Sequence, residues 1–224
     1  MLTTEARQKI LADNEAAAGE LRQRFAAAGT LVVDLISGPG SGKTSLLEET
    51  ARRMSRELRL GCVVGDIATE RDARRLAAAG LRARQIMTGG ACHLDARVVR
   101  DAVDAERFGE LDILFIENVG NLVCPASYAL GEDFKIVLLS VTEGQDKPLK
   151  YPGIFSRACA AVITKIDLLP YVRFDLEQAR GEIRLLRPDA QIVLTSVTTG
   201  EGIESWCDLL RGALERKRRP ALVP

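Results

Sequence analysis

The sequence has a single histidine among its 224 residues, and it has no excess of charge of either sign. Lysine plus arginine and aspartate plus glutamate each number 31, so no net field points to nucleic acid or a membrane surface as a partner. No apolar run approaches the roughly 20 residues that a membrane-spanning helix needs. These absences exclude a membrane span and leave a chain that is 46% hydrophobic and long enough to bury a core.

Cysteine is also sparse, and no two of the five cysteines stand in a Cys-x-x-Cys pair. An odd number of cysteines without that spacing argues against a disulfide framework. Residues 1–29 are rich in alanine but interrupted by charge every few positions, which predicts an amphipathic helix rather than a signal peptide. We therefore expect a cytoplasmic protein whose thiols stay reduced.

Short runs of apolar and β-branched residues alternate with segments of helical apolar spacing. The runs are continuously apolar, as expected for strands that are covered on both faces. This alternation predicts an α/β fold, a single doubly wound, mostly parallel sheet flanked by helices, whose ligands bind beyond the carboxyl ends of the strands. The strands are expected at residues 31–37, 61–66, 83–88, 112–118, 135–141, 161–166 and 191–196.

The stretch SGPGSGKT follows the first expected strand and leads into a helix. Such a glycine-rich turn aims backbone N–H groups at phosphates, and the helix N-terminus adds a favourable dipole. Lys43 would neutralise phosphate charge and the Thr44 hydroxyl would ligate Mg²⁺, although Ser37 stands where the strict P-loop pattern has its first glycine. The nucleotide-binding residues expected in this loop are Gly38, Gly40, Ser41, Gly42, Lys43, Thr44 and Ser45.

The stretch ITKID places Lys165 and Asp167 after the sixth expected strand. It resembles the N-K-x-D motif of GTPases, whose aspartate accepts two hydrogen bonds that guanine can donate and adenine cannot. Thr164 replaces the asparagine. The stretch TSVTTGEG follows the last strand, where GTPases place a loop beside the guanine, so Ser196 and Val197 are expected to contribute. Residues 30–224 are therefore predicted to form a P-loop GTPase domain onto which the helix of residues 1–29 packs.

Acidic residues follow two other strands at the edge where ligands are expected. Glu117, in ENVG, can hold the Mg²⁺ shell or a water, and the N–H of Gly120 can meet a γ-phosphate. Asp66 and Asp72 follow the second strand, and each is either a ligand of Mg²⁺ or water, or an ordinary cap or surface charge. The expected catalytic set is Lys43, Asp66, Asp72, Glu117 and Gly120, and the expected Mg²⁺ set is Thr44, Asp66 and Glu117.

The stretch TGGACHLDAR places Cys92 beside His93, directly after an expected strand. Alone, such a pair more often contains a structural histidine than a ligand. Cys124 follows ENVGNLV, so both loops can lie on the same edge of the sheet. Two thiolates and an imidazole suit Ni²⁺ or Zn²⁺, and three ligands leave a site that water or a second copy must complete. The remaining cysteines, Cys62, Cys159 and Cys207, are predicted to pack in the core.

Together these motifs resemble the HypB family of nickel-insertion GTPases that act in [NiFe]-hydrogenase maturation, SIMIBI-class relatives of the urease GTPase chaperone. The resemblance spans about residues 14–215, and CHLDA and ENVGNLVCPA are its most specific pieces. It implies Mg²⁺-dependent GTP hydrolysis to GDP, and metal at Cys92, His93 and Cys124 in a homodimer interface favoured by GTP. It also implies that Lys150 reaches the nucleotide or Asp167 of the opposite subunit. A HypA-like nickel-delivery protein and the hydrogenase large subunit are the implied partners.

The cysteine-rich N-terminal nickel motif of some family members is missing from these residues, so nickel is expected only in the GTPase domain. We hypothesise that loss of the γ-phosphate relaxes residues 117–124, moves Cys124 and loosens the dimer. Two alternatives stay open. A P-loop kinase acting on a small molecule would leave the guanine motif unexplained, and a zinc-stabilised dimer would keep its nucleotide only structurally.

Overall fold

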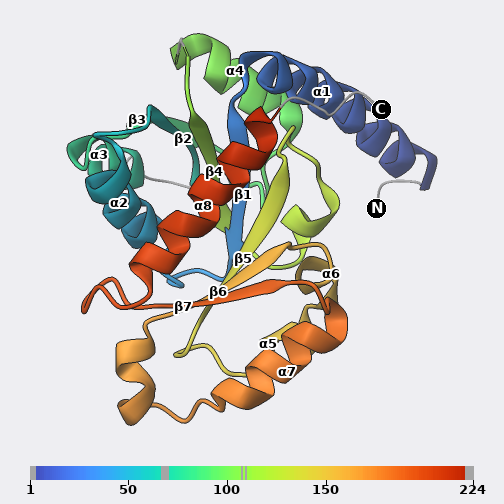
Figure 1. Cartoon of the computed structure of the whole chain (residues 1–224). Helices are drawn as coiled ribbons and strands as arrows, with labels where there is room; N and C mark the ends of the chain where they lie inside the picture. The colour runs from blue at the N-terminus through green and yellow to red at the C-terminus, as the bar shows by residue number, and fades with distance from the viewer. Residues whose placement is uncertain (1–3, 67–70, 107, 109, 220–224) are drawn as a thin grey trace.

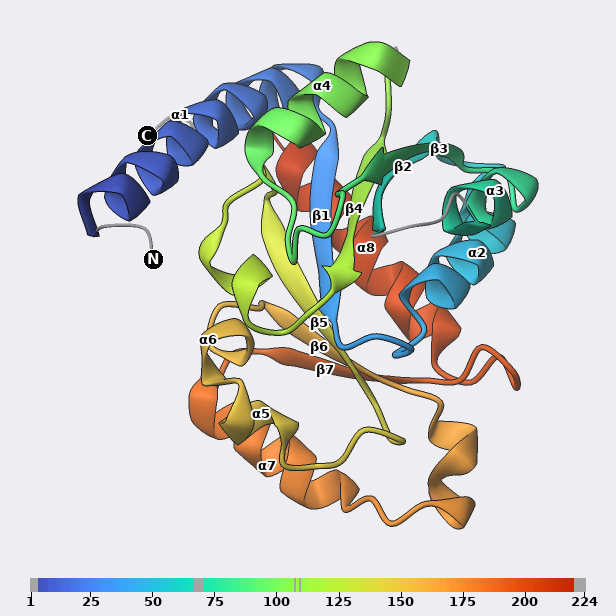
Figure 2. The same cartoon turned by 180° about the vertical axis from the view of Figure 1, so that it is seen from behind.

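The computed structural model describes residues 4–66, 71–106, 108 and 110–219. Seven strands form one sheet in the order β3-β2-β4-β1-β5-β6-β7, and every neighbouring pair is parallel (Figures 1 and 2). All seven predicted strands are present, and the doubly wound parallel fold is confirmed. The strands are β1 Leu31–Ser37, β2 Leu60–Asp66, β3 Arg82–Met87, β4 Ile113–Gly120, β5 Phe134–Ser140, β6 Ala160–Thr164 and β7 Gln191–Thr195.

Helices cover both faces of the sheet because neighbouring residues of each central strand point to opposite sides. In β1, Leu31 and Val33 pack in one core with α2 (Lys43–Met54), α3 (Arg71–Ala78) and α8 (Ile203–Arg218). Val32 packs on the other face in a core shared with α1 and α4. The other described helices are α1 Thr4–Ala28, α4 Ala96–Glu106, α5 Lys147–Lys150, α6 Pro152–Phe155 and α7 Leu176–Leu186, and the 3-10 helices are η1 Cys124–Ser127 and η2 Ile166–Tyr171.

The prediction that every strand is covered on both faces is wrong for β3. Arg82, Arg84 and Met87 of this strand are exposed because β3 stands at the edge of the sheet. The four short segments η1, α5, α6 and η2 were not predicted either. Each is only one or two turns long and contains a proline, so none carries a helical apolar period.

The helix α1 lies along α4 on one face of the sheet, and Figures 1 and 2 show the two side by side. The buried side chains of α1 are spaced three or four residues apart, the period expected of an amphipathic helix: Asn14, Ala17, Ala18, Leu21 and Phe25. The apolar members of this set share their core with α4 and with residues just before it.

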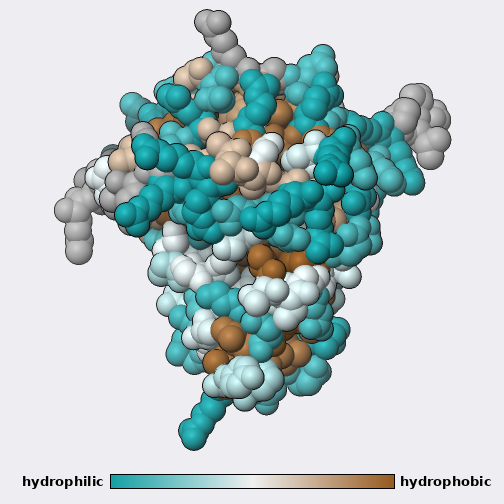
Figure 3. All heavy atoms as spheres, turned by 90° about the vertical axis from the view of Figure 1, so that its left-hand side faces the viewer, coloured by the Kyte–Doolittle hydropathy of each residue, from teal (hydrophilic) through white to brown (hydrophobic). Residues whose placement is uncertain are grey.

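None of the described helices combines the length and the apolarity that a membrane crossing requires. The face that carries α2 and α3 is mostly hydrophilic in its upper half, and apolar side chains show in the lower half (Figure 3). All five cysteines are free thiols. Cys62 and Cys207 are fully buried and Cys159 packs against the core, as predicted for the three cysteines outside the candidate metal site.

Candidate functional site

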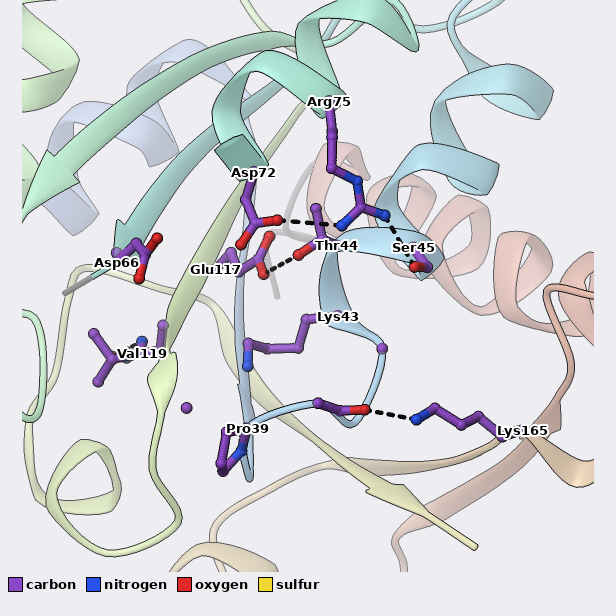
Figure 4. Close-up of a pocket in the computed structure, with 15 residues that line it drawn as sticks. Pro39, Lys43, Thr44, Ser45, Asp66, Asp72, Arg75, Glu117, Val119 and Lys165 are labelled. Atoms are coloured by element: carbon purple, nitrogen blue, oxygen red, sulfur yellow. Dashed lines mark hydrogen bonds and ion pairs between the residues drawn. The ribbon is translucent and has the colours of Figure 1, made fainter. Parts of the chain in front are cut away.

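A cleft of about 460 Å³ opens at the carboxyl ends of β1, β2 and β4, where the parallel sheet is expected to bind ligands (Figure 4). It is lined by the P-loop and by the ends of the neighbouring strands. Many of the predicted residues meet here: Gly40, Gly42, Lys43, Thr44, Ser45, Asp66, Asp72, Glu117, Gly120 and Lys165. Pro39, Arg75, Asn118 and Val119 also line the cleft and were not predicted.

The P-loop holds Lys43 in a buried position. Its side-chain Nζ donates a 2.8 Å hydrogen bond to the hydroxyl of Ser37, and burial lowers the pKa of the ammonium group. Ser37, which departs from the strict P-loop pattern, therefore supplies a hydrogen-bond partner for Lys43. Gly40 and Gly42 adopt φ angles of 76° and 94°, which only glycine adopts at low cost.

Glu117 is the buried acid of the cleft, with 4% of its surface exposed. The Thr44 hydroxyl donates a 2.7 Å hydrogen bond to Glu117 Oε1, and Oε2 is buried with no hydrogen-bond partner among the described residues (Figure 4). Burial raises the pKa of Glu117 to about 7, although Lys43 opposes the shift. A buried carboxylate oxygen without a partner beside a hydroxyl is a donor set that suits Mg²⁺.

The two aspartates whose roles the sequence left open both line the cleft. Asp66 ends β2, and Asp72 lies in the first turn of α3. Arg75, one turn further along α3, contacts Asp72 and the hydroxyl of Ser45 at 3.2 Å each (Figure 4). It also pairs with Glu48 of α2 at 2.8 Å. Arg75 thus ties Asp72 to the helix that follows the P-loop. The sequence could have indicated Arg75, because it lies one helical turn after the candidate acid Asp72.

A second cleft of about 280 Å³ shares Gly42, Ser45 and Lys165 with the first and continues to Asp167 and Val197. Asp167 Oδ1 accepts a 2.6 Å hydrogen bond from the buried Ser196 hydroxyl. The residues that two separate motifs predict for reading guanine therefore lie together. Lys165, Asp167 and Val197 line a pocket that joins the phosphate cleft, and Ser196 bonds to Asp167.

The stretch ITKID contacts the P-loop directly. Lys165 takes a positive φ of 59°, and its Nζ donates to the carbonyl of Gly40 at 2.7 Å. Thr164, which stands in place of the motif asparagine, donates its hydroxyl to the carbonyl of Ser41 at 2.7 Å. Thr164 therefore ties the end of β6 to the phosphate loop.

Glu143, in the loop after β5, is a further residue that the sequence analysis missed. Its carboxylate accepts hydrogen bonds from the Ser41 hydroxyl at 2.7 Å and from the Ser140 N–H at 2.9 Å. A side chain at Gly38 would meet this carboxylate, so Glu143 packs closely against the P-loop backbone. Lys150, further along the same segment, is exposed and paired with Asp146, and it lines neither cleft.

The three candidate metal ligands also come together. The ligand atoms of Cys92, His93 and Cys124 all lie within 4.8 Å of one another. The Tyr128 ring stacks on the imidazole of His93 with a centroid distance of 3.8 Å. Burial lowers the pKa of His93, and a neutral imidazole is the form that binds metal. The neighbouring Cys124 thiol raises the pKa of Cys92. This cluster can hold a soft or borderline divalent ion.

One segment connects the two sites. β4 carries Glu117 in the phosphate cleft, and the chain continues to Cys124. Gly120 packs so closely on the P-loop that a side chain there would lie 2.9 Å from Pro39 Cα. Asn121 Nδ2 donates to the carbonyl of Cys92 at 3.1 Å. Residues 117–124 therefore contact both the phosphate loop and the segment that carries Cys92 and His93.

Comparison with known proteins agrees with this geometry. The model of the family described as "CobW/HypB/UreG, nucleotide-binding domain" matches residues 31–194. The hydrogenase maturation factor HypB of Escherichia coli K12 is 48% identical over 201 residues, which cover 90% of this chain and 69% of the relative. The chain belongs to the HypB family. The resemblance inferred from the motifs is confirmed.

Two solved structures of the HypB family share the fold. HypB from Helicobacter pylori, crystallised in complex with nickel, is 39% identical with a TM-score of 0.87 and covers 95% of this chain and 100% of its own. The hydrogenase maturation factor HypB from Archaeoglobus fulgidus is 40% identical with a TM-score of 0.86, and the match covers 91% of this chain and 100% of that one. The cleft around the P-loop thus belongs to the nucleotide-binding domain of the HypB family.

Proposed function

We propose that this chain is a GTP-hydrolysing metallochaperone that binds nickel and supports its insertion into a [NiFe]-hydrogenase, with GTP-dependent dimerisation coupled to metal binding. The observation that carries the proposal is the segment of residues 117–124, which begins at a buried acid in the phosphate cleft and ends at a thiol of the three-ligand cluster. The nickel-bound HypB of Helicobacter pylori supports nickel as the cargo.

The phosphate cleft supports binding of Mg²⁺–GTP. Lys43 and the backbone N–H groups of residues 40–45 would hold the phosphates, and Asp167 would accept the two hydrogen bonds that only guanine donates. Thr44 and Glu117 would hold Mg²⁺, which neutralises phosphate charge when bound. Asp66 or Asp72 would position the attacking water, because both line the phosphate cleft.

The three-ligand cluster supports a metal site that two copies of the chain share and from which the ion is later released. Three protein ligands leave a tetrahedral or square-planar ion incomplete, and a second copy or water would supply the rest. Lys150 would reach the nucleotide or Asp167 of the opposite subunit, because it is exposed and outside its own clefts. Zn²⁺ would compete for the same ligands. A HypA-like nickel donor and the hydrogenase large subunit are the partners we expect in the cytoplasm.

The coupling would follow from the contacts of residues 117–124. Loss of the γ-phosphate would remove the group that orders Glu117 and Gly120, and the change would reach Cys124 and the dimer. By linkage, metal and GTP would each raise the other's affinity by one common factor.

An anaerobic Ni²⁺ titration followed by thiolate-to-metal absorption tests this proposal. We expect a non-hydrolysable GTP analogue to tighten binding relative to GDP, and Cys124→Ala to abolish that gain. Cys159→Ala is the matched control, because it removes a half-buried thiol outside the cluster. Equal nickel affinity with both nucleotides would contradict the coupling.

Turnover assays separate this proposal from its two alternatives. Mg²⁺-dependent release of phosphate from GTP without any acceptor is expected, and it would count against a small-molecule kinase. Absence of hydrolysis with Mg²⁺ and excess metal would instead favour a zinc-stabilised binding module.

A further inference from the structure

A polar residue occupies the buried face of α1. Asn14 is 3% exposed and takes the first position of a stripe that continues through Ala17, Ala18 and Leu21. Helical periodicity calls for an apolar residue at this position, and burying an amide is unfavourable unless both of its atoms are hydrogen-bonded. The contacts of Asn14 must therefore account for its presence.

Both atoms of the Asn14 amide have partners, and the partners lie on the two segments that carry the metal ligands. Its Oδ1 accepts a 2.8 Å hydrogen bond from the N–H of Ala96, which begins α4 directly after the Cys92–His93 segment. Its Nδ2 donates a 2.9 Å hydrogen bond to the carbonyl of Ala129, just beyond η1 and Cys124. A single side chain thus bridges two segments that are far apart in the sequence.

Packing supports the same bridge independently. Gly131 takes a φ of 84°, and a side chain there would lie 2.5 Å from Leu21 Cβ, so the chain after η1 rests directly on α1. Leu94 and Leu130, one from each segment, share a buried core with Leu21. Tyr128, beside Ala129, stacks on the ring of His93. Both segments therefore pack on α1 and on each other.

The other side of the metal cluster is held by β4 and the residue that follows it. Asn118 Oδ1 accepts a hydrogen bond from the N–H of Leu94 at 3.3 Å, and Asn121 bonds to the carbonyl of Cys92. Three asparagine side chains thus hold the backbone at residues 92, 94 and 96. Asn118 and Asn121 belong to residues 117–124, and Asn14 belongs to α1.

We propose that Asn14 is a positioning residue of the metal site, through which α1 holds the Cys92–His93 segment and the Cys124 segment at the spacing that the ion requires. The inference rests on the proposed metal site and adds a structural part to it that supplies no ligand. Residues that orient ligands without touching the ion typically change metal affinity by about 10- to 100-fold when removed.

Two substitutions test the role of Asn14, and a third is a matched control. Asn14→Leu keeps the size and helical character of the side chain and removes both bonds, while Asn14→Asp keeps the acceptor for Ala96 and removes the donor to Ala129. Thr30→Val removes a comparable buried hydrogen bond, the 2.8 Å bond from Thr30 Oγ1 to the carbonyl of Leu111. Thr30 lies just beyond the C-terminal end of α1. Each variant is titrated anaerobically with Ni²⁺, and its Tm and Mg²⁺–GTP affinity are measured on the same preparation.

We expect Asn14→Leu to weaken nickel binding about tenfold or more. Asn14→Asp should weaken it at least as much, because a buried carboxylate oxygen would face the Ala129 carbonyl. Thr30→Val should leave it unchanged at a similar loss of Tm. GTP affinity should stay within about twofold of wild type in all three, because the P-loop lies outside these contacts. Wild-type nickel affinity in both Asn14 variants, or an equal loss in Thr30→Val, would overturn the positioning role. If Asn14→Leu fails to fold, Asn14→Asp decides between these outcomes.

The wild-type titration separates this inference from the function on which it rests. If wild-type protein shows no thiolate-to-nickel absorption that depends on Cys124, the proposed metal site is wrong and the role of Asn14 falls with it. If that absorption is present and unchanged in the Asn14 variants, only the positioning role is wrong.

Discussion

The phosphate cleft and the metal cluster are built in different ways. Residues 37–45 are contiguous, and their turn and helix start follow from glycine, lysine and threonine at fixed spacing. Cys92 and His93 come from the segment before α4, and Cys124 begins η1. The side chains of Asn14, Asn118 and Asn121 hold the backbone around Cys92 and His93. A site made by a local motif resists distant change, whereas a site made by packing depends on residues that never touch its ligand.

The largest effect is expected from a substitution at Asp167, in the pocket proposed to bind guanine, which leaves the metal cluster intact. Asp167→Asn places an amide donor opposite the donors of guanine, so GTP affinity should fall about a hundredfold or more. Xanthosine triphosphate, which carries an oxygen in place of the amino group, should bind better than GTP. Competition titrations measure both affinities. Unchanged GTP binding would show that Asp167 does not read the base.

A second prediction concerns the residue that both regions share. Asn118→Ala removes the 3.1 Å hydrogen bond to the buried Asp34 and the acceptor for the Leu94 N–H, so unfolding free energy should fall by about 2 kcal/mol. Both GTP and nickel binding should weaken. Asn121→Ala is the control, because its bond to Cys92 should affect nickel alone. Urea unfolding and the two titrations measure these effects. Loss at only one site in Asn118→Ala would contradict a shared role.

The third prediction uses pH to probe the buried acid of the phosphate cleft. The folded pKa of Glu117 is raised from 4.5 to about 7 by burial, so between these values the folded state binds more protons than the unfolded state. Stability of the nucleotide-free protein should therefore fall as pH rises from 4.5 to 7, by a few degrees in Tm. Thermal unfolding in the absence of Mg²⁺, repeated across this pH range, measures the change in Tm. Glu117→Gln should flatten this part of the profile, and an equally steep profile in that variant would assign the decline to other groups.

The smallest effect is expected at the surface between α1 and α4. Arg24 and Asp104 form an ion pair whose side chains are each about half exposed, so Asp104→Asn should cost less than about 0.5 kcal/mol. Nickel affinity should not change, in contrast to Asn14→Leu. The anaerobic Ni²⁺ titration and a Tm measurement check the nickel affinity and the stability of Asp104→Asn. A loss of nickel affinity in Asp104→Asn would show that any contact of α1 matters, rather than the buried amide.

Much of the nucleotide site was predictable because each of its motifs is a short stretch of adjacent residues. The P-loop, ITKID and TSVTTGEG each follow an expected strand, and parallel strands bring their carboxyl ends to one edge. The structure added Glu143, the role of Ser37 and the bond from Arg75 to Glu48. The spacing of Arg75 from Asp72 was visible in the sequence, but no local pattern indicates the other contacts.

The sequence alone determined the doubly wound sheet, the phosphate loop and the three residue types of the metal cluster, because strand burial and local turns depend on nearby residues. Only the tertiary structure decided that the two metal-ligand segments meet and that Asn14 of α1 bridges them. A buried asparagine in an alanine-rich helix is one polar residue among many in the sequence. Its function depends on two backbone groups more than eighty residues away in the chain, which only packing brings within hydrogen-bond distance.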